Sequence, residues 1–157
     1  MSGCCADHCE TPAVAPGLGV CPLCGKKGKA VSLLTVKSLV KDHTRVAPGA
    51  YLFCRTPDCE AVYFSPEAVF RKADLKVRAG VKETEDPVPL CYCFDYTRAD
   101  VRRDIEETGA TDILERIKAE VKAGYCACEV KNPSGDCCLG DITRAIQDAK
   151  ALVAASR

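Results

Sequence analysis

The sequence predicts an α+β fold in which a small β unit precedes a small helical unit. In the first half, short runs of β-branched and aromatic residues alternate with turn residues, which is typical of strands. In the second half, the hydrophobic period becomes that of helices. Between the halves, the polar segment 83–89 contains two prolines, which indicates a linker. We therefore expect a β unit at 21–86 and a helical unit at 87–157, preceded by a flexible cysteine-rich tail at 1–20.

The β unit is expected to contain three strands, at 31–36, 50–53 and 61–64. Apolar, β-branched and aromatic residues dominate these segments, and a Pro-Gly pair at 48–49 marks a turn before the second of them. The segment 72–82 could extend the sheet, although its pattern leaves the type of element open.

The helical unit is expected to contain three helices. Thr97 and Asp100 form a capping box that opens the first helix, and Gly109 suits the position that ends it. Thr111 caps the second helix, whose apolar residues recur at helical spacing on one face. Asp141 caps the third helix, which continues almost to the end of the sequence.

The charge balance argues against some classes of partner. The 157 residues include 22 Lys or Arg and 22 Asp or Glu, so the net charge is zero. A protein that binds mainly nucleic acid or an anionic membrane usually needs a basic surface, and we expect neither partner here. No apolar run approaches the about 20 residues of a transmembrane helix, and the N-terminus lacks the pattern of a signal peptide. We therefore expect a cytoplasmic protein without a membrane span.

Thirteen cysteines are the most unusual feature of the composition. A disulfide framework would require an oxidising compartment, whereas the count is odd and a secretion signal is missing. Close pairs such as Cys91-x-Cys93 and Cys126-x-Cys128 also suit metal chelation better than bonds within the pair. Metal ligation is therefore the better account of the cysteines, which stand at positions 4, 5, 9, 21, 24, 54, 59, 91, 93, 126, 128, 137 and 138.

Two cysteine pairs in the β unit predict a zinc site. Cys21-x-x-Cys24 and Cys54-x-x-x-x-Cys59 form two short chelating loops with predicted strand between them. Zinc in a structural site takes four tetrahedral ligands, and two such loops on neighbouring hairpins supply them, as in zinc ribbons. A unit of this size also needs such a site, because its core alone would be marginally stable. The alternative is four buried free cysteines, and it leaves the paired spacing unexplained.

Six cysteines in the helical unit predict a second metal centre. They either precede the first helix or lie between the second and third helices, so two helices return the chain to one place. Converging thiolates of this kind suit an iron–sulfur cluster. Spacing alone cannot select four ligands from six, and a second zinc ion is the competing interpretation. The six are Cys91, Cys93, Cys126, Cys128, Cys137 and Cys138.

The sequence around the first of these cysteines carries a family resemblance. Pro89-Leu90-Cys91-Tyr92-Cys93-Phe94 is followed by a helical hairpin and then by further cysteines. This arrangement resembles the bacterioferritin-associated ferredoxin-like domain. That family holds a two-iron two-sulfur cluster by a Cys-x-Cys pair and a later Cys-x-x-Cys pair. The present sequence departs from the pattern, because it has CEVKNPSGDCC at 128–138 instead of a second Cys-x-x-Cys.

The variant spacing and the zinc ligands ahead of it together resemble the N-terminal domain of the archaeal CopZ-type copper chaperones. The likeness covers roughly residues 20–142 and includes FCRTPDCEAVYF at 53–64. It implies a zinc site at Cys21, Cys24, Cys54 and Cys59. It also implies a two-iron two-sulfur cluster whose ligands are Cys91, Cys93, Cys128 and Cys138. Cys126 and Cys137 are close neighbours of these ligands in the sequence.

The tail is a candidate site for metal capture. In the CopZ family a copper-binding domain with a Met-x-Cys-x-x-Cys loop follows the region of resemblance, whereas Met1 is the only methionine here. Direct copper delivery by that loop is therefore not expected. Cys4, Cys5 and Cys9 place three soft thiolates beside His8 and suit a thiophilic ion such as copper(I). The alternative is a tail whose cysteines have no such role.

Together these features predict a redox-active metal-handling protein that takes part in electron transfer. A two-iron cluster transfers one electron, and one electron converts copper(II) to copper(I). The expected partners are copper or another thiophilic metal ion and a protein that exchanges electrons or metal. Two alternatives stay open, a small ferredoxin-like electron carrier and an interaction module without redox chemistry. Recognisable catalytic motifs are missing, so at most the one-electron reduction of a bound metal ion is expected.

Overall fold

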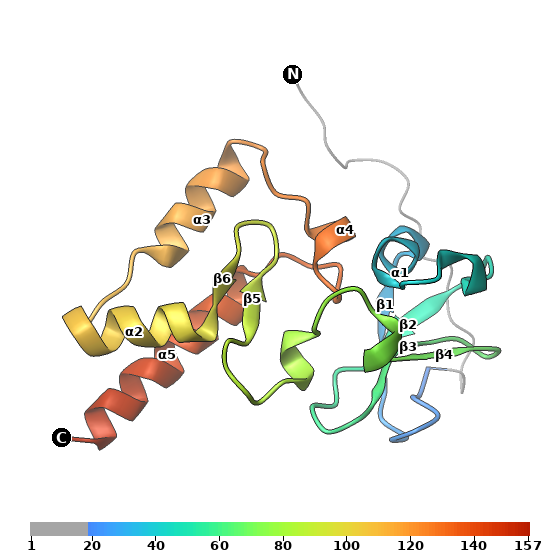
Figure 1. Cartoon of the computed structure of the whole chain (residues 1–157), viewed down its shortest axis with the longest axis horizontal. Helices are drawn as coiled ribbons and strands as arrows, with labels where there is room; N and C mark the ends of the chain where they lie inside the picture. The colour runs from blue at the N-terminus through green and yellow to red at the C-terminus, as the bar shows by residue number, and fades with distance from the viewer. Residues whose placement is uncertain (1–18) are drawn as a thin grey trace.

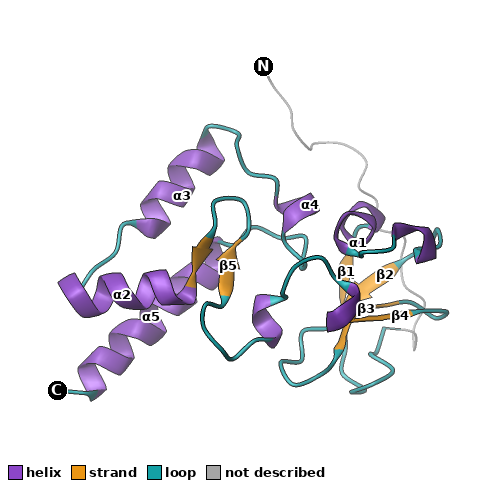
Figure 2. Ribbon diagram, viewed as in Figure 1, coloured by secondary structure: helices purple, strands orange, loops and turns teal. Residues whose placement is uncertain are grey.

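The computed structural model describes residues 19–157, and in this part of the chain two groups of elements lie side by side (Figure 1). The sheet group holds β1 to β4 and α1, and the helical group holds β5, β6 and α2 to α5. Figure 2 shows that strands dominate the first group and helices the second. The prediction of a mixed helix and sheet protein is confirmed. The tail cysteines Cys4, Cys5 and Cys9 lie outside the described residues.

The sheet is antiparallel throughout, and its strands follow chain order. Leu52 pairs with Ala30 on one side and with Phe64 on the other, so the second strand is central. Both central strands are buried along their whole length. Aromatic and β-branched side chains favour such a pleated, buried surface. The strands are β1 (Lys29–Val31), β2 (Tyr51–Phe53), β3 (Ala61–Phe64) and β4 (Val69–Arg71).

The helix α1 (Leu33–Leu39) occupies most of the segment predicted as a strand at 31–36, so that prediction is wrong beyond Val31. Ser32 begins the helix, because its hydroxyl accepts a hydrogen bond from the Thr35 amide at 3.1 Å. The buried side chain of Val36 on α1 then belongs to the core of the sheet group, and Leu33 packs against that core. A short apolar run does not distinguish a strand from the buried face of a helix, and here the serine cap decides.

The segment 72–82 contains two short 3-10 helices and no further strand. These are η2 (Lys72–Asp74) and η3 (Gly80–Lys82), and a third such helix, η1 (His43–Arg45), precedes β2. After η3 comes the predicted linker, which is attached to the helical group. The Asp86 carboxylate accepts hydrogen bonds from Arg98 at 2.8 Å and from Arg102 at 2.9 Å.

The three predicted helices of the second half are present, with a short additional helix between the last two. The capping box of Thr97 and Asp100 forms as predicted, and Gly109 ends the first helix at a φ of 78°. Two of these helices, α2 and α3, pack against α5. No helix in the described part of the chain is long and apolar enough to cross a membrane. The elements are β5 (Pro89–Cys91), β6 (Tyr96–Thr97), α2 (Arg98–Thr108), α3 (Ile113–Lys122), α4 (Cys128–Lys131) and α5 (Leu139–Ala155).

Two helix starts differ slightly from the prediction. The residue before α3 is Asp112, although the hydroxyl of the predicted cap Thr111 accepts a hydrogen bond from the Ile113 amide at 3.3 Å. The helix α5 begins at Leu139, and Asp141 lies in its first turn, where negative charge is favourable. Both differences are within the one or two residues by which helix boundaries ordinarily vary.

A turn at 132–135, closed by a hydrogen bond from the Gly135 amide to the Asn132 carbonyl oxygen, joins the two groups of elements. The buried Tyr63 hydroxyl on β3 donates a hydrogen bond to the Pro133 carbonyl oxygen at 2.6 Å. Lys29 on β1 also forms an ion pair with Asp136. Near this turn, α1 of the sheet group packs against α4 of the helical group. The segment that leads into α5 is therefore held against the sheet.

The substitution Tyr63→Phe is expected to lower the free energy of unfolding by about 1–3 kcal/mol, because the buried Pro133 carbonyl loses its donor. Urea unfolding followed by circular dichroism measures this loss. Tyr51→Phe is the matched control, since the Tyr51 hydroxyl donates to Ala47 within the sheet group at 3.0 Å. Only Tyr63→Phe should accelerate amide hydrogen exchange at 134–136. Equal exchange there in both variants would contradict the joining role of this turn.

Candidate metal centres

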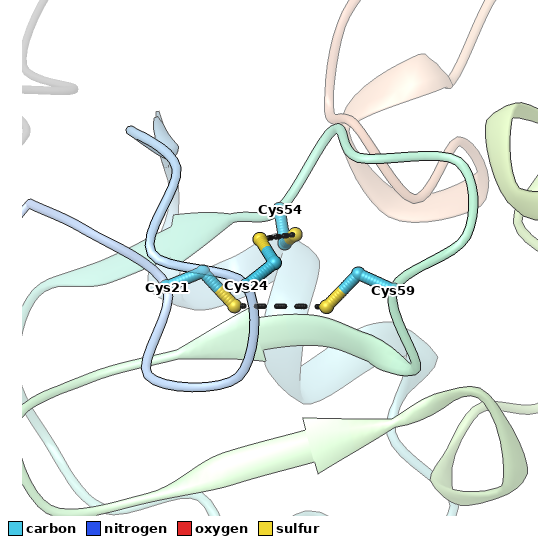
Figure 3. Close-up of side chains that lie close together, drawn as sticks. All are labelled: Cys21, Cys24, Cys54 and Cys59. Carbon is cyan, nitrogen blue, oxygen red and sulfur yellow. Dashed lines mark hydrogen bonds between the residues drawn. The ribbon is translucent and has the colours of Figure 1, made fainter.

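The four cysteines of the sheet group converge on one point (Figure 3), and their sulfur atoms all lie within 4.8 Å of one another. The sulfur of Cys21 is 3.8 Å from that of Cys59, and the sulfur of Cys24 is 3.7 Å from that of Cys54. Four sulfur atoms bound tetrahedrally at about 2.3 Å from one zinc ion would lie about 3.8 Å apart. The cysteines present therefore fit a zinc ion.

Backbone hydrogen bonds hold the two chelating loops, which are the first loop at 21–24 and the second loop at 54–59. The Cys21 amide donates to the Lys26 carbonyl oxygen at 2.8 Å, which closes the first loop. The second loop connects the central strands β2 and β3, and the Cys54 amide donates to Val62 at 2.8 Å. Because both central strands are buried, the position of the second loop is fixed by the core.

Burial and hydrogen bonding affect the four thiols differently. Cys21 and Cys59 are buried, and removal from water raises the pKa of both thiols, that of Cys59 to about 12. A hydrogen bond with the Thr56 hydroxyl, 3.3 Å from the sulfur, lowers the pKa of Cys24 to about 6. Thr56 lies in the second loop, but its hydroxyl forms a hydrogen bond with a cysteine of the first loop. Sequence reasoning missed this contact, because it depends on how the loops face each other.

Four cysteines of the helical group meet in two pairs. Cys91 at the end of β5 and Cys138 directly before α5 are both buried in the same hydrophobic core, and the two thiols influence each other's pKa. Cys93 and Cys128 are partly exposed, and their sulfur atoms lie 3.6 Å apart. This separation is close to that expected of two thiolates bound to one tetrahedral metal ion.

Hydrogen bonds and burial also change the pKa values of these thiols. The interaction between Cys91 and Cys138 lowers the pKa of Cys91 to about 6 and raises the pKa of Cys138. One member of this pair therefore ionises readily while the other keeps its proton. Burial raises the pKa of Cys128 to about 12, and the Ala127 amide donates a hydrogen bond to the Cys93 sulfur at 3.1 Å. Amide donors of this kind stabilise the thiolate form that binds metal.

The two other cysteines of the helical group are exposed to solvent. Cys137 lines an open cleft of about 490 Å³ between the sheet group and the helical group. Cys126 follows Tyr125, the side chain of which is 70% exposed. Exposure to solvent thus distinguishes these two cysteines from the buried Cys91 and Cys138, a distinction that spacing in the sequence did not provide.

The fold and the four-cysteine site define a zinc-binding domain, and comparison with known proteins supports this class. Residues 18–76 match the zf_CopZ family, described as a zinc binding domain. The chain is 41% identical over 119 residues to the copper chaperone CopZ of Archaeoglobus fulgidus, a match that covers 75% of this chain and 57% of that protein. The chain thus spans a little over half the length of this relative.

A solved structure identifies the family of the chain more narrowly. The X-ray structure of the Archaeoglobus fulgidus CopZ N-terminal domain matches with a TM-score of 0.65 and 38% identity. The match covers 80% of this chain and 95% of that one. The chain belongs to the family of CopZ N-terminal domains. The resemblance found in the sequence is therefore confirmed for the zinc-binding part.

Zinc binding is expected to weaken as the pH falls. Before metal binds, the raised pKa values of Cys21 and Cys59 keep both thiols protonated at neutral pH, so binding must release these protons. Release of these two protons alone lowers the apparent affinity about 100-fold for each unit by which the pH falls. Competition with a chelator at pH 8 and pH 7, corrected for protonation of the chelator, measures the change. An affinity independent of pH would show that both thiols are already ionised.

Proposed function

We propose that this chain is a redox-active metal-handling protein with one structural zinc ion and one two-iron two-sulfur cluster. Its similarity to a copper chaperone supports a role in the trafficking or reduction of copper or another thiophilic metal. The proposed compartment is the cytoplasm, where thiols stay reduced. The partners are a thiophilic metal ion and a protein that exchanges electrons or metal. The proposed cluster ligands are Cys91, Cys93, Cys128 and Cys138.

The pairing of the helical-group cysteines is the observation that supports the cluster best. A single tetrahedral ion needs four ligand atoms that are all close together, whereas a two-iron cluster takes one pair of ligands on each iron. In the described part of the chain, the four zinc-site cysteines are the one group whose ligand atoms all lie within 4.8 Å. Among the cysteines of the helical group, Cys93 lies beside Cys128 and Cys91 interacts with Cys138, but no four of their sulfur atoms lie within that distance of one another. This arrangement favours two irons over a second zinc ion.

The two pairs differ in their access to solvent, which bears on electron transfer. Cys91 and Cys138 belong to the buried hydrophobic core of the helical group. Cys93 and Cys128 are partly exposed, so this pair is the edge that a partner can approach. When bound, a two-iron cluster supplies one-electron chemistry, with a potential that depends on hydrogen bonds to sulfur and on solvent exposure. The chain leaves one edge of the site open to a metal or protein partner.

Anaerobically purified protein is expected to contain two irons and one zinc per chain. Its visible absorption should bleach with dithionite, and a spin-half electron paramagnetic resonance signal should appear, because a two-iron cluster accepts one electron. Protein that holds two zinc ions and no iron, even after anaerobic reconstitution with iron and sulfide, would overturn the cluster. A cluster that cannot be reduced reversibly would favour the interaction module.

Ligand variants sharpen the same test. Cys128→Ser and Cys138→Ser should abolish or strongly change the visible spectrum, because each removes a ligand. Cys126→Ser and Cys137→Ser are matched controls, since both residues are exposed and lie near an assigned ligand in sequence. Their spectra should equal that of the unmodified protein. An unchanged spectrum in Cys128→Ser would show that the ligand assignment is wrong.

Metal capture by Cys4, Cys5 and Cys9 stays a prediction, because these cysteines lie outside the described residues. Three soft thiolates in one short segment should bind one copper(I) ion per chain. Copper(I) titration of zinc-loaded protein under anaerobic conditions measures this stoichiometry, and serine at all three positions should abolish it. Equal copper binding by the serine variant would assign the copper to other cysteines. Reduction of copper(II) by the dithionite-reduced protein then distinguishes a metal-handling protein from a general electron carrier.

A further inference from the structure

One lysine side chain in the described part of the chain is buried. Lys82 in η3 is 4% exposed, and buried lysines are rare because an ammonium group loses its hydration on burial. Its Nζ donates hydrogen bonds to the carbonyl oxygens of Thr56 at 2.8 Å and Cys59 at 3.1 Å. Both acceptors belong to the second chelating loop, and within the described residues Lys82 forms no ion pair with a carboxylate. The positive charge is therefore directed at a metal-binding loop.

With zinc bound, the four-cysteine site carries the negative charge that can balance the charge of the lysine. One Zn²⁺ ion with four thiolates carries two net negative charges. Carbonyl oxygens orient an ammonium group but supply no full charge, and buried charges are stable when they are paired. The ammonium of Lys82 lies against the backbone of a ligand residue, Cys59. Burial of this lysine is therefore explained by the metal centre beside it.

We propose that Lys82 is a positioning residue of the zinc centre: it holds the second chelating loop in place and offsets the negative charge of the four thiolates. This inference rests on the zinc site described above. Outer groups that fix metal ligands in this way usually change metal affinity by about 10- to 100-fold when they are removed. Lys82 thus affects how tightly zinc is held without being a ligand.

The same contact reaches the first chelating loop through Thr56. The Thr56 carbonyl oxygen accepts the hydrogen bond from Lys82, and the Thr56 hydroxyl lies 3.3 Å from the Cys24 sulfur. A change in the position of this backbone carbonyl therefore moves a group that contacts the opposite loop. Through this residue, one lysine contributes to the geometry of both pairs of zinc ligands.

The position of Lys82 is fixed by the contacts of its own short helix, η3. The Gly80 amide donates to the Tyr92 hydroxyl at 2.8 Å, and that hydroxyl donates to Arg78 at 2.7 Å. A Cβ atom on Gly80 would stand 2.2 Å from the Pro89 carbonyl oxygen, so glycine is required for this close approach. These contacts hold the backbone of η3 in place, and the two hydrogen bonds to the second loop then orient the ammonium group.

Removal of the ammonium group tests the proposal. We expect full-length, zinc-loaded Lys82→Met to release zinc to a colorimetric chelator about 10- to 100-fold faster than the unmodified chain. The absorption bands of the cobalt(II)-substituted protein should also shift, because they report the geometry of the four sulfur ligands. A role in general stability would leave these bands unchanged. Lys82→Gln, which keeps a donor but no charge, should give an intermediate release rate and replaces Lys82→Met if the latter does not fold.

Lys72→Met is the matched control. This substitution removes the same charge at a nearby position. The Lys72 Nζ contacts the Lys82 carbonyl oxygen at 3.4 Å and the Glu83 carboxylate at 3.6 Å rather than a chelating loop. Its zinc release should equal that of the unmodified chain. Unchanged release in Lys82→Met, or equal acceleration in Lys72→Met, would overturn the proposal. If the unmodified chain holds no zinc, the zinc site itself fails, which metal analysis of that chain shows separately.

Discussion

The repulsion between neighbouring thiolates is the constraint on which the sheet group depends. Four sulfur atoms lie within 4.8 Å of one another, and three of these cysteines are buried with Leu52 and Phe64 in one small core. Four negative charges at such distances would repel one another strongly, so a bound cation is needed before all four thiols can ionise. The bound metal then ties the start of the sheet group to the turn between β2 and β3. The short strands consequently need little other support at that end.

Contacts between the two groups explain why the helical-group spacing departs from Cys-x-x-Cys. The chain between Cys128 and Cys138 contains α4 and the turn whose Pro133 carbonyl oxygen accepts the hydrogen bond from the Tyr63 hydroxyl. A two-residue connection would leave no room for this turn. The longer spacing therefore allows one segment both to carry two proposed ligands and to bind the sheet. The zinc-binding group thereby supports the position of the proposed cluster site.

Local signals in the sequence were sufficient for much of this structure. The chelating loops, the β2 and β3 strands, and the capping box at Thr97 each follow from a few adjacent residues. The error at α1 arose because a short apolar segment is compatible with either a strand or a helix, and only the cap at Ser32 distinguishes them. The roles of Thr56 and Lys82 could not be predicted, because they depend on contacts between loops distant in sequence.

Differences in burial divide the cysteines by the chemistry that they can support. Cys21, Cys54 and Cys59 are buried, so an ion at the zinc site is shielded from competing ligands and suits a structural role. Cys126 and Cys137 are exposed, and the Cys93 and Cys128 pair is partly exposed, so exchange of electrons or metal with a partner is feasible there. A site that holds one metal firmly must be buried from solvent, whereas a site that exchanges electrons or another metal must be accessible to a partner. A zinc centre in the sheet group and the proposed cluster in the helical group satisfy both requirements in one short chain, because the sheet group forms the surface against which the proposed cluster site is held.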